Sequence, residues 1–259
     1  IAASDKSLKD LALYPDSNGF YLRKKLSSIF DLNINNVILG AGSEGIMATI
    51  MRTFLNESDS ILATENSFIG FKVLANASGR KIDWVPMKYF RYDLEEMSNQ
   101  ITDNTKIIYL ANPDNPTGSY FNKEEFDFFM DKVPERCLVI LDEAYYEYAS
   151  SISDYPDSMI YRYDNVITLR TFSKSYGLAG LRVGYGFAHD SLISNLMKVK
   201  LPFEPSVPAQ VAAIAALDDR QHLEATLYEN KKQMAKVEKV FKNFNLSYIP
   251  SSTNFITLV

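Results

Sequence analysis

The sequence has little cysteine and little histidine, and this excludes several kinds of site. Its one cysteine, Cys137, has no partner for an internal disulfide and lies in the apolar run 137–141, so we interpret it as a core residue. No cluster of His, Cys, Asp and Glu has metal-ligand spacing, and we therefore expect no metal. His189 and His222 fall outside every motif described below and are not expected to be catalytic.

The sequence also lacks an excess of basic residues and any long hydrophobic run. The formal net charge is -5, and lysine and arginine are not concentrated anywhere, which argues against a nucleic-acid partner. The longest apolar stretches, such as 211–217, are far shorter than a membrane span, and the chain begins without a charged and apolar leader. We expect a cytoplasmic protein without a membrane partner.

What the sequence does contain is an alternation of short β-branched runs with helical patterns, over 259 residues. This alternation predicts an α/β fold with a mostly parallel, seven-stranded sheet flanked by helices. The predicted strands are Val37–Leu39, Ser60–Thr64, Lys81–Val85, Lys106–Leu110, Cys137–Leu141, Val166–Arg170 and Arg182–Ala188. The predicted helices between them, from apolar residues three and four apart, are Gly45–Leu55, Phe68–Ala77, Lys123–Lys132 and Asp190–Val199.

After this region the pattern changes to helices alone, over 207–217 and 220–244. The lysines of the second helix, Lys231, Lys232, Lys236, Lys239 and Lys242, are interpreted as a solvated face. The final run, 252–259, is predicted to be a strand that opens a second, smaller domain. We thus expect a large domain at 18–220, and parts of a small domain at 1–17 and 221–259, with sequence missing at both ends.

A glycine-rich loop, Gly40–Gly45, follows the first predicted strand and precedes a helix. It satisfies the G-x-G-x-x-G dinucleotide pattern, and Glu65 lies where a ribose-binding acid would be needed. Glycines let backbone N–H groups approach a phosphate, and the helix N-terminus adds partial positive charge. The loop alone leaves three interpretations open: a nicotinamide dinucleotide as in an NAD-dependent dehydrogenase, another phosphate ligand, or a structural turn.

Four further segments follow predicted strands, at the carboxyl edge where open α/β folds bind ligands. They are Asn112–Gly118, Asp142–Tyr145, Thr171–Lys174 with Gly177, Gly180 and Arg182 after it, and Ser67–Phe68. Each has a simpler explanation when taken alone: a proline-rich turn, a helix N-cap, a solubilising lysine, or a core aromatic ring. Taken together, they place an amine, a carboxylate, a phenol and an aromatic ring along one edge.

With these segments, the sequence resembles the fold-type I pyridoxal-phosphate (PLP) aminotransferases, and among them most closely the histidinol-phosphate aminotransferase group. The resemblance runs from Leu13–Asp16 through Leu39–Glu44, Asn112–Gly118 and Asp142–Tyr145 to Ser173–Arg182, and the last segment is the most specific. It implies a large PLP-binding domain, a small domain that closes over the substrate, and a homodimer. It leaves the dinucleotide interpretation with little support.

The resemblance implies a role for each matching residue. Lys174 would form the Schiff base with PLP and move the proton during transamination, and Asp142 would pair with the pyridine nitrogen. Tyr145 and Asn115 would donate hydrogen bonds to the phenolate oxygen, and Phe68 would stack on the ring where the family often has tyrosine. The expected phosphate ligands are backbone N–H groups of Gly42, Ser43 and Glu44, hydroxyls of Thr171 and Ser173, and the guanidinium of Arg182. Tyr14 would reach the phosphate of the neighbouring subunit.

The implied reaction moves an amino group from a small-molecule donor to a 2-oxoacid, and the specific expectation is L-histidinol phosphate with 2-oxoglutarate. Two alternatives share the same cofactor motifs: an aromatic amino acid aminotransferase, and a lyase that resembles threonine-phosphate decarboxylase. The arginines that recognise the substrate belong largely to the small domain in this family, and we expect them to lie beyond the end of this sequence. Donor specificity is therefore not readable from the chain.

Overall fold

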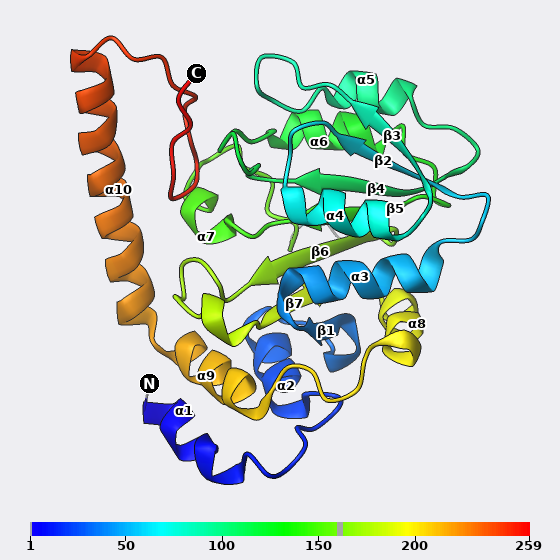
Figure 1. Ribbon diagram of the computed structural model, residues 1–259, viewed down its shortest axis with the longest axis vertical. Coiled ribbons are helices and arrows are strands. Elements are labelled where there is room, and N and C mark those ends of the chain that lie inside the picture. The colour runs from blue at the N-terminus through cyan, green and yellow to red at the C-terminus, as the bar shows by residue number, and fades with distance from the viewer. Residues whose placement is uncertain (1, 160–162) are drawn as a thin grey trace.

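A seven-stranded β-sheet forms the centre of the computed structural model, which describes residues 2–159 and 163–259 (Figure 1). The strands are β1 (Val37–Gly40), β2 (Ser60–Thr64), β3 (Lys81–Val85), β4 (Thr105–Ala111), β5 (Leu138–Asp142), β6 (Val166–Thr171) and β7 (Gly184–Phe187). Their order across the sheet is β1-β7-β6-β5-β4-β2-β3. Strand β7 is antiparallel to β1 and β6, and the other pairs are parallel, which confirms the predicted mostly parallel sheet.

Helices cover both faces of this sheet. They are α1 (Ala2–Ser7), α2 (Phe20–Ile29), α3 (Gly42–Phe54), α4 (Ile69–Ala77), α5 (Leu94–Asn99), α6 (Lys123–Met130), α7 (Tyr146–Ala149), α8 (Asp190–Val199), α9 (Val207–Asp218) and α10 (Arg220–Asn243), with 3-10 turns η1 (Leu8–Asp10), η2 (Ile34–Asn36) and η3 (Ala179–Leu181). One face packs against α3, α4 and α8. The other packs against α5 and α6 near β3, and against α2 and α9 near β1.

The strands of the sheet interior are apolar on both faces because helices lie on both sides. In β4, Ile107, Tyr109 and Ala111 point into the core beneath α3 and α4, whereas Ile108 and Leu110 point into the core beneath α5 and α6. This two-residue alternation is the geometry of an extended strand. It places Tyr109 and Ala111 on the same face of the sheet as the N-terminus of α3.

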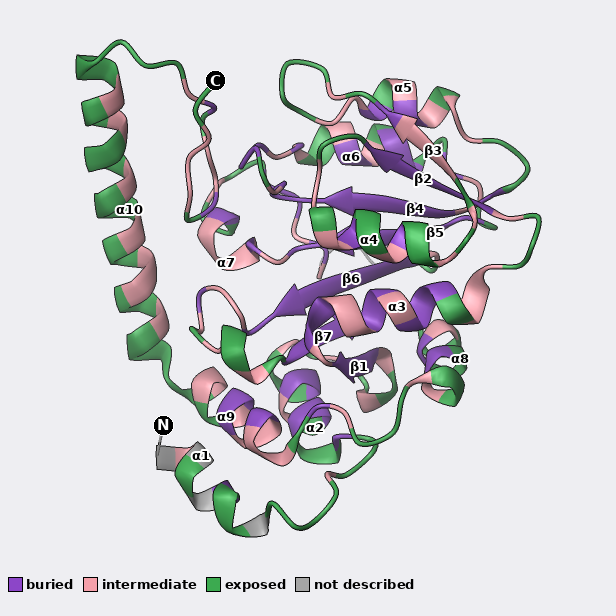
Figure 2. Ribbon diagram, viewed as in Figure 1, coloured by how far each residue is buried: buried purple, intermediate pink, exposed green. Residues whose placement is uncertain are grey.

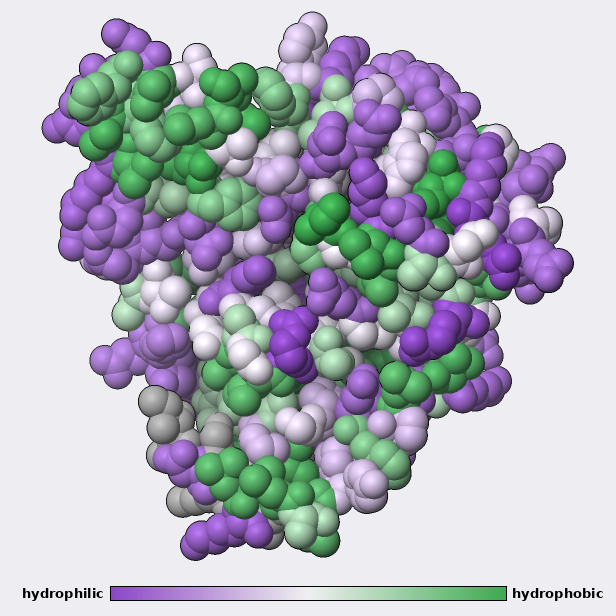
Figure 3. Space-filling view, viewed as in Figure 1, coloured by the Kyte–Doolittle hydropathy of each residue, from purple (hydrophilic) through white to green (hydrophobic). Residues whose placement is uncertain are grey.

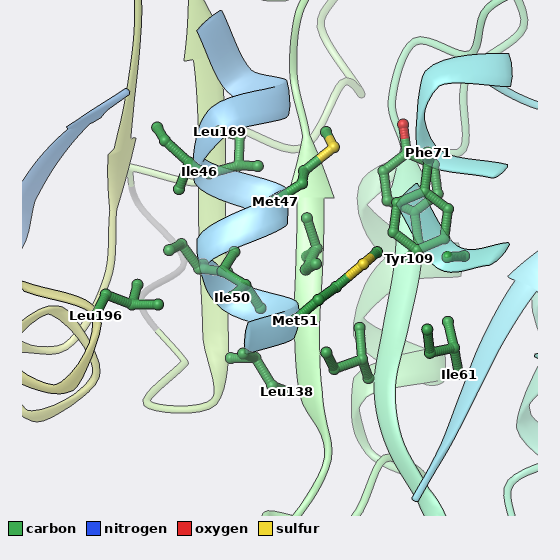
Figure 4. Packing of buried hydrophobic residues seen from close by; sticks show 14 of the residues in the cluster. Ile46, Met47, Ile50, Met51, Ile61, Phe71, Tyr109, Leu138, Leu169 and Leu196 are labelled. Carbon is green, nitrogen blue, oxygen red and sulfur yellow. The ribbon is translucent and has the colours of Figure 1, made fainter. Parts of the chain in front are cut away.

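Helix α3 is the main support of the first face. Its Ile46, Met47, Ile50 and Met51 point toward the sheet, where Figure 4 shows them among residues of β5, β6 and α8. These residues are spaced three and four apart, so that one stripe of the helix is apolar and faces the core. The packing holds the glycine loop before α3 against the end of the sheet.

The long helix α10 differs from the other long helices because none of its residues is buried, as Figure 2 also shows. The lysines predicted to form a solvated face are all exposed. Among residues 2–159 and 163–259, no helix combines the length and apolar character needed to cross a membrane. Helix α1, at the other end of the chain, packs against α9.

The predicted strand at 252–259 is wrong. The chain from Ser247 to Val259 folds back on itself with a single antiparallel bridge, between Tyr248 and Leu258. Two of its polar groups bond to another loop: the Ser252 N–H donates to the Gly118 carbonyl (2.8 Å), and the Thr257 hydroxyl donates to the Pro116 carbonyl. The segment therefore lies against the 112–118 turn instead of extending a sheet. The division into a large and a small domain stays a prediction.

Candidate active site

A cavity of about 250 Å³ lies at the carboxyl edge of the parallel strands. In Figure 1 the arrowheads of β4 and β6 point to this edge, toward α7 and the C-terminal segment. Side chains and backbone from the ends of β4, β5 and β6, from the first turn of α3 and from the start of α4 form its walls. They are Ser43, Glu44, Phe68, Tyr109, Ala111, Pro113, Asn115, Asp142, Ala144, Tyr145, Thr171, Ser173, Lys174, Ala179 and Arg182.

Most residues predicted from the sequence come together in this cavity. Ser43, Glu44, Phe68, Asn115, Asp142, Tyr145, Thr171, Ser173, Lys174 and Arg182 all line it. Gly42 borders it, since a Cβ atom there would lie 2.6 Å from Arg182 Nη2. Tyr14 does not reach it, and instead stacks on Phe203 with ring centroids 4.3 Å apart and 79% of its surface exposed.

Asp142 ends β5 and is the buried carboxyl group of the cavity. The Tyr109 hydroxyl donates to its Oδ2 (2.9 Å), and the Ala144 N–H donates to its Oδ1 (3.2 Å). Burial raises the pKa of Asp142 to about 6, although these two donors and the nearby Lys174 charge act in the opposite direction. The group is therefore ionised near neutral pH and can pair with a positively charged or N–H-bearing ring.

The amine of Lys174 lies close to Tyr145, with Nζ 5.2 Å from the centre of the phenol ring. Asn115 Nδ2 donates to the Tyr145 hydroxyl oxygen (3.2 Å). Burial, together with the neighbouring charge of Asp142, raises the pKa of Tyr145 to about 12. The phenol thus keeps its proton at neutral pH, accepts from Asn115 and can donate to a group inside the cavity.

The other end of the cavity suits an anion. Helix α3 begins at Gly42 (φ 73°), and Ala41 before it offers no side-chain cap, so partial positive charge at the helix N-terminus faces the cavity. A Cβ atom at Gly184 would lie 2.6 Å from the Ser43 nitrogen, so this glycine lets the first turn of α3 sit directly on β7. Arg182 also reaches this end and contacts Glu44 (3.1 Å).

The 112–118 turn is held by a buried carboxyl group, Asp114, which is 0% exposed. Its Oδ1 accepts from the Ser67 hydroxyl (2.5 Å), and its Oδ2 accepts from the Thr117 hydroxyl (2.8 Å). Ser67 precedes Phe68 in the chain. The Asp114 contacts therefore join the two loops that bring Asn115 and Phe68 to the cavity.

A buried ion pair lies behind the cavity and was not predicted from the sequence. Arg170 Nε donates to Glu143 Oε2 at 2.8 Å, and both side chains are 1% exposed. The Arg170 guanidinium also lies over the Tyr146 ring, 3.3 Å from its centre. Glu143 follows Asp142, and Arg170 precedes Thr171, so this pair ties together the two strand ends that carry the cavity residues.

Sequence reasoning also missed some of the cavity wall. Pro113, Ala144 and Ala179 lay inside recognised motifs without being singled out, and Tyr109 was interpreted only as part of a strand. A signal for Tyr109 was present: it stands two residues before Ala111, at the end of β4, and therefore shares its face of the sheet.

The glycine loop does not sit in the setting that a dinucleotide would need. The strand before it, β1, lies at the edge of the sheet and pairs only with β7, antiparallel. A dinucleotide fingerprint belongs to the first strand of a parallel βαβ unit. Glu65 is exposed and does not line the cavity. The loop can therefore bind a phosphate, but its surroundings do not fit a dinucleotide.

The sequence profile of a family described as aminotransferase class I and II matches residues 2–259. The chain belongs to the class I and II aminotransferase family. The resemblance found in the motifs is thereby confirmed, and the chain is an aminotransferase with the fold-type I architecture.

Individual relatives of this aminotransferase share most of its length. A histidinol-phosphate aminotransferase of Geobacillus sp. (strain WCH70) is 40% identical over 255 residues, which are 98% of this chain and 70% of that protein. The crystal structure of histidinol-phosphate aminotransferase from Sinorhizobium meliloti in complex with pyridoxal-5'-phosphate matches with a TM-score of 0.93 and 29% identity, over 99% of this chain and 70% of that one.

A third comparison concerns the fold alone. The L-threonine-O-3-phosphate decarboxylase of Porphyromonas gingivalis has a TM-score of 0.83 at 19% identity, over 97% of this chain and 75% of that one. The same architecture therefore occurs in a protein named as a lyase, and the fold does not by itself decide the reaction. Within the described part of the aminotransferase, no three His, Cys, Asp or Glu side chains gather as metal ligands.

The buried ion pair generates a first prediction. Glu143→Ala leaves the Arg170 charge buried without its closest partner, which costs roughly 3–5 kcal/mol for pairs of this kind. Urea unfolding, followed by circular dichroism, measures the loss. The control is Asp103→Ala, which removes the carboxylate of the exposed pair Arg136–Asp103 (3.7 Å) and for which we expect less than about 1 kcal/mol. Equal losses for the two variants would contradict the proposed importance of burial.

The raised pKa of Asp142 generates a second prediction, for the protein without cofactor. Because the folded pKa, about 6, lies above the usual aspartate value of 3.8, the folded state binds this proton more tightly than the unfolded state. The associated stability is fully present below about pH 4 and is lost as the pH rises through 6, by about 3 kcal/mol.

Asp142→Asn removes this titration. Glu147, whose pKa burial raises to about 7, acts in the same direction but is retained in the variant. The unfolding free energy of the wild type should therefore fall more steeply than that of Asp142→Asn between pH 4 and 7. Parallel curves for the two proteins would show that Asp142 has an ordinary pKa.

Proposed function

We propose that this cavity binds PLP and that the enzyme transfers the amino group of L-histidinol phosphate to 2-oxoglutarate, yielding imidazole acetol phosphate and L-glutamate in histidine biosynthesis. The observation that carries the proposal is the joint placement of the Lys174 amine, the buried Asp142 carboxylate and the Arg182 guanidinium in the wall of one cavity. Each group matches a different part of the cofactor. The names of the relatives in Geobacillus and Sinorhizobium meliloti support the choice of substrate.

The cavity fits PLP in its chemistry. Its apolar parts, which include Phe68, Ala111 and Ala144, are suited to a flat aromatic ring. Its volume of about 250 Å³ is close to the lower end of the range of roughly 300–1,000 Å³ that is usual for small-molecule sites. The polar groups stand at its ends, as a ring with a nitrogen at one end and a phosphate at the other requires.

The bound cofactor would supply an electrophilic carbon and a ring that accepts electrons. Lys174 would bond to it and, after the donor amine takes its place, carry a proton from the donor α-carbon. Asp142 would hold a proton on the ring nitrogen, because a carboxylate that is ionised near neutral pH favours the charged ring. Tyr145 and Asn115 would donate hydrogen bonds to the ring oxygen.

The phosphate would lie against the first turn of α3. Backbone N–H groups of Gly42, Ser43 and Glu44 point from the helix N-terminus, and hydroxyls of Thr171 and Ser173 lie 2.9 Å apart beside them. Arg182 would add a forked, charged donor. Since Glu44 contacts the same guanidinium, its carboxylate must share Arg182 with the phosphate or move aside.

We also propose a homodimer in the cytoplasm, with Tyr14 completing the site of the neighbouring subunit. Tyr14 does not line the cavity of its own subunit. It belongs to residues 8–21, a segment with many exposed large apolar side chains. These are Leu8, Leu11, Leu13, Tyr14, Phe20 and Tyr21, each at least 47% exposed, and Phe203, which stacks on Tyr14, is 46% exposed. Figure 3 shows hydrophobic surface gathered at the lower end of the molecule, where this segment runs. Exposed apolar patches of this kind are typical of protein interfaces.

A half-reaction screen tests the proposed reaction. The purified protein is loaded with PLP, and the cofactor spectrum is followed while histidinol phosphate, phenylalanine, glutamate and threonine phosphate are added separately. We expect histidinol phosphate and glutamate to bleach the PLP band, and 2-oxoglutarate to restore it. Lys174→Ala should bind PLP without forming the borohydride-reducible bond, and its turnover should fall by at least about 10³-fold because the amine both bonds and moves the proton.

Each other outcome points to a different reaction. Bleaching by phenylalanine but not by histidinol phosphate favours an aromatic amino acid aminotransferase. Release of carbon dioxide from threonine phosphate, without any need for a 2-oxoacid, favours the lyase. A protein that fails to take up PLP at all would exclude the proposed function.

Subunit mixing tests the role of Tyr14. If Tyr14 completes the neighbouring site, a heterodimer of Lys174→Ala and Tyr14→Ala subunits has one site with both residues intact. Random mixing should then restore about one quarter of wild-type activity, because half of the dimers are mixed and each has one intact site. The assay is run at a PLP concentration that does not saturate Tyr14→Ala alone. No recovery, with mixed dimers verified by mass, would place Tyr14 outside the shared site.

A further inference from the structure

We propose that Tyr109 is a positioning residue for the proposed reaction, whose phenol holds the Asp142 carboxylate in place and in its charged form. The inference rests on the proposed function, in which Asp142 faces the ring nitrogen of the cofactor. Its structural basis is a direct contact: the Tyr109 hydroxyl donates to Asp142 Oδ2 at 2.9 Å. Neither the family motifs nor the sequence analysis singled out this tyrosine.

The Tyr109 ring is held rigidly. It stacks on Phe71 of α4 with ring centroids 3.8 Å apart and an interplanar angle of 9°. Figure 4 shows the two rings lying one over the other. Tyr109 and Phe71 are each 1% exposed. Close packing of this kind restricts the ring, so that the hydroxyl is held toward the carboxylate.

The direction of the hydrogen bond is also determined. Burial and the Asp142 charge raise the pKa of Tyr109 well above the usual tyrosine value, so the phenol keeps its proton and is the donor. The other groups that bear on Asp142 are the Lys174 amine, which favours its charged form, and the Glu143 carboxylate, which opposes it. Tyr109 is thus the neutral side chain that offsets burial of the carboxylate.

The contact leaves room for the cofactor. An ionised carboxylate has about four acceptor positions on its two oxygens. Tyr109 uses one position on Oδ2, and the Ala144 N–H uses one on Oδ1. Both donors come from fixed backbone or a stacked ring, so they set the plane of the carboxylate before a ring N–H approaches it.

Tyr92 provides a matched control. It is a half-buried tyrosine near the same strand end, but its hydroxyl bonds to Ser67 Oγ (2.8 Å) and accepts from the Ala111 N–H (3.0 Å), with no hydrogen bond to Asp142. Tyr92→Phe therefore removes one buried phenolic hydroxyl, as Tyr109→Phe does, without touching the carboxylate. A purely structural effect of losing a buried hydroxyl should appear in both variants.

The test measures the Asp142 titration in the protein without cofactor, by carbon NMR of labelled aspartate, with Asp142→Asn used to assign the signal. We expect Tyr109→Phe to raise the midpoint by about one pH unit, which corresponds to about tenfold weaker preference for the charged form. Tyr92→Phe should leave the midpoint within about 0.3 unit. An unchanged midpoint in Tyr109→Phe overturns the inference.

A second substitution acts in the opposite direction and preserves the packing. Replacement of Tyr109 by 3-fluorotyrosine makes the phenol a stronger donor and should lower the Asp142 midpoint. If Tyr109→Phe does not fold, this variant still decides the matter, since a midpoint that stays in place or rises contradicts the proposed contact. Both variants keep an aromatic ring against Phe71.

The PLP-loaded enzyme supplies the functional readout. In Tyr109→Phe we expect kcat to fall about tenfold with little change in KM, because the phenol acts through Asp142 and not by binding the substrate. The acidic limb of the pH profile should move to higher pH together with the Asp142 midpoint. The two hypotheses fail separately. Failure to bind PLP would contradict the proposed function. The Asp142 titration in the protein without cofactor tests the role of Tyr109 independently of PLP binding.

Discussion

The parallel pairing of β4, β5 and β6 is the constraint on which the rest of the site depends. In register, Ala111 pairs with Asp142, and Asp142 pairs with Leu169, so β4 and β5 end at one level and β6 ends two residues beyond it, at Thr171. The loops that follow carry Asn115, Tyr145 and Lys174 to a common cavity. A shift of one residue in β5 would turn Asp142 to the opposite face of the sheet, away from Tyr109. The chemistry is therefore set by backbone hydrogen bonds far more than by contacts between the functional side chains.

Buried charge at this edge is stable only because each charged group has a specific partner. Glu143 is matched by Arg170, and Asp114 by the hydroxyls of Ser67 and Thr117. Asp142 accepts fewer hydrogen bonds, one from a neutral phenol and one from a backbone N–H, whereas Asp114 also accepts from the Thr117 N–H. Burial therefore still raises its pKa, and a positively charged ring placed beside it would relieve the cost. The Asp142 carboxylate lines the cavity, where a ring N–H could add a further hydrogen bond.

The sequence predicted the sheet well because its signal is local. Runs such as 60–64 and 81–85 are short, rich in β-branched residues and bounded by turn formers, and they became β2 and β3 with the predicted bounds. Helix α2 was missed although Leu22 and Leu26, four apart, are its buried residues, because its other positions mix apolar and basic side chains. The run 252–259 has strand-like composition, yet its backbone bonds to the 112–118 turn. A contact with a loop that is distant in the sequence cannot be predicted from the local pattern of residues.

The same limit explains which parts of the candidate site were predictable. Lys174, Asp142 and Asn115 directly follow predicted strands or lie in the loops after them. Polar side chains at these positions indicate a binding or catalytic site. Tyr109 and Arg170 lie inside strands, where an aromatic ring is ordinary core and a single arginine has no visible partner until Glu143 is placed beside it. Each residue bonds to a partner on a neighbouring strand that is 27 or more positions away in the sequence. Contacts of this kind depend on strand order, and the order β6-β5-β4 came only from the folded chain. Residues that are expected to contact the ligand could therefore be predicted from the sequence. Residues that hold them in place were found only in the structure.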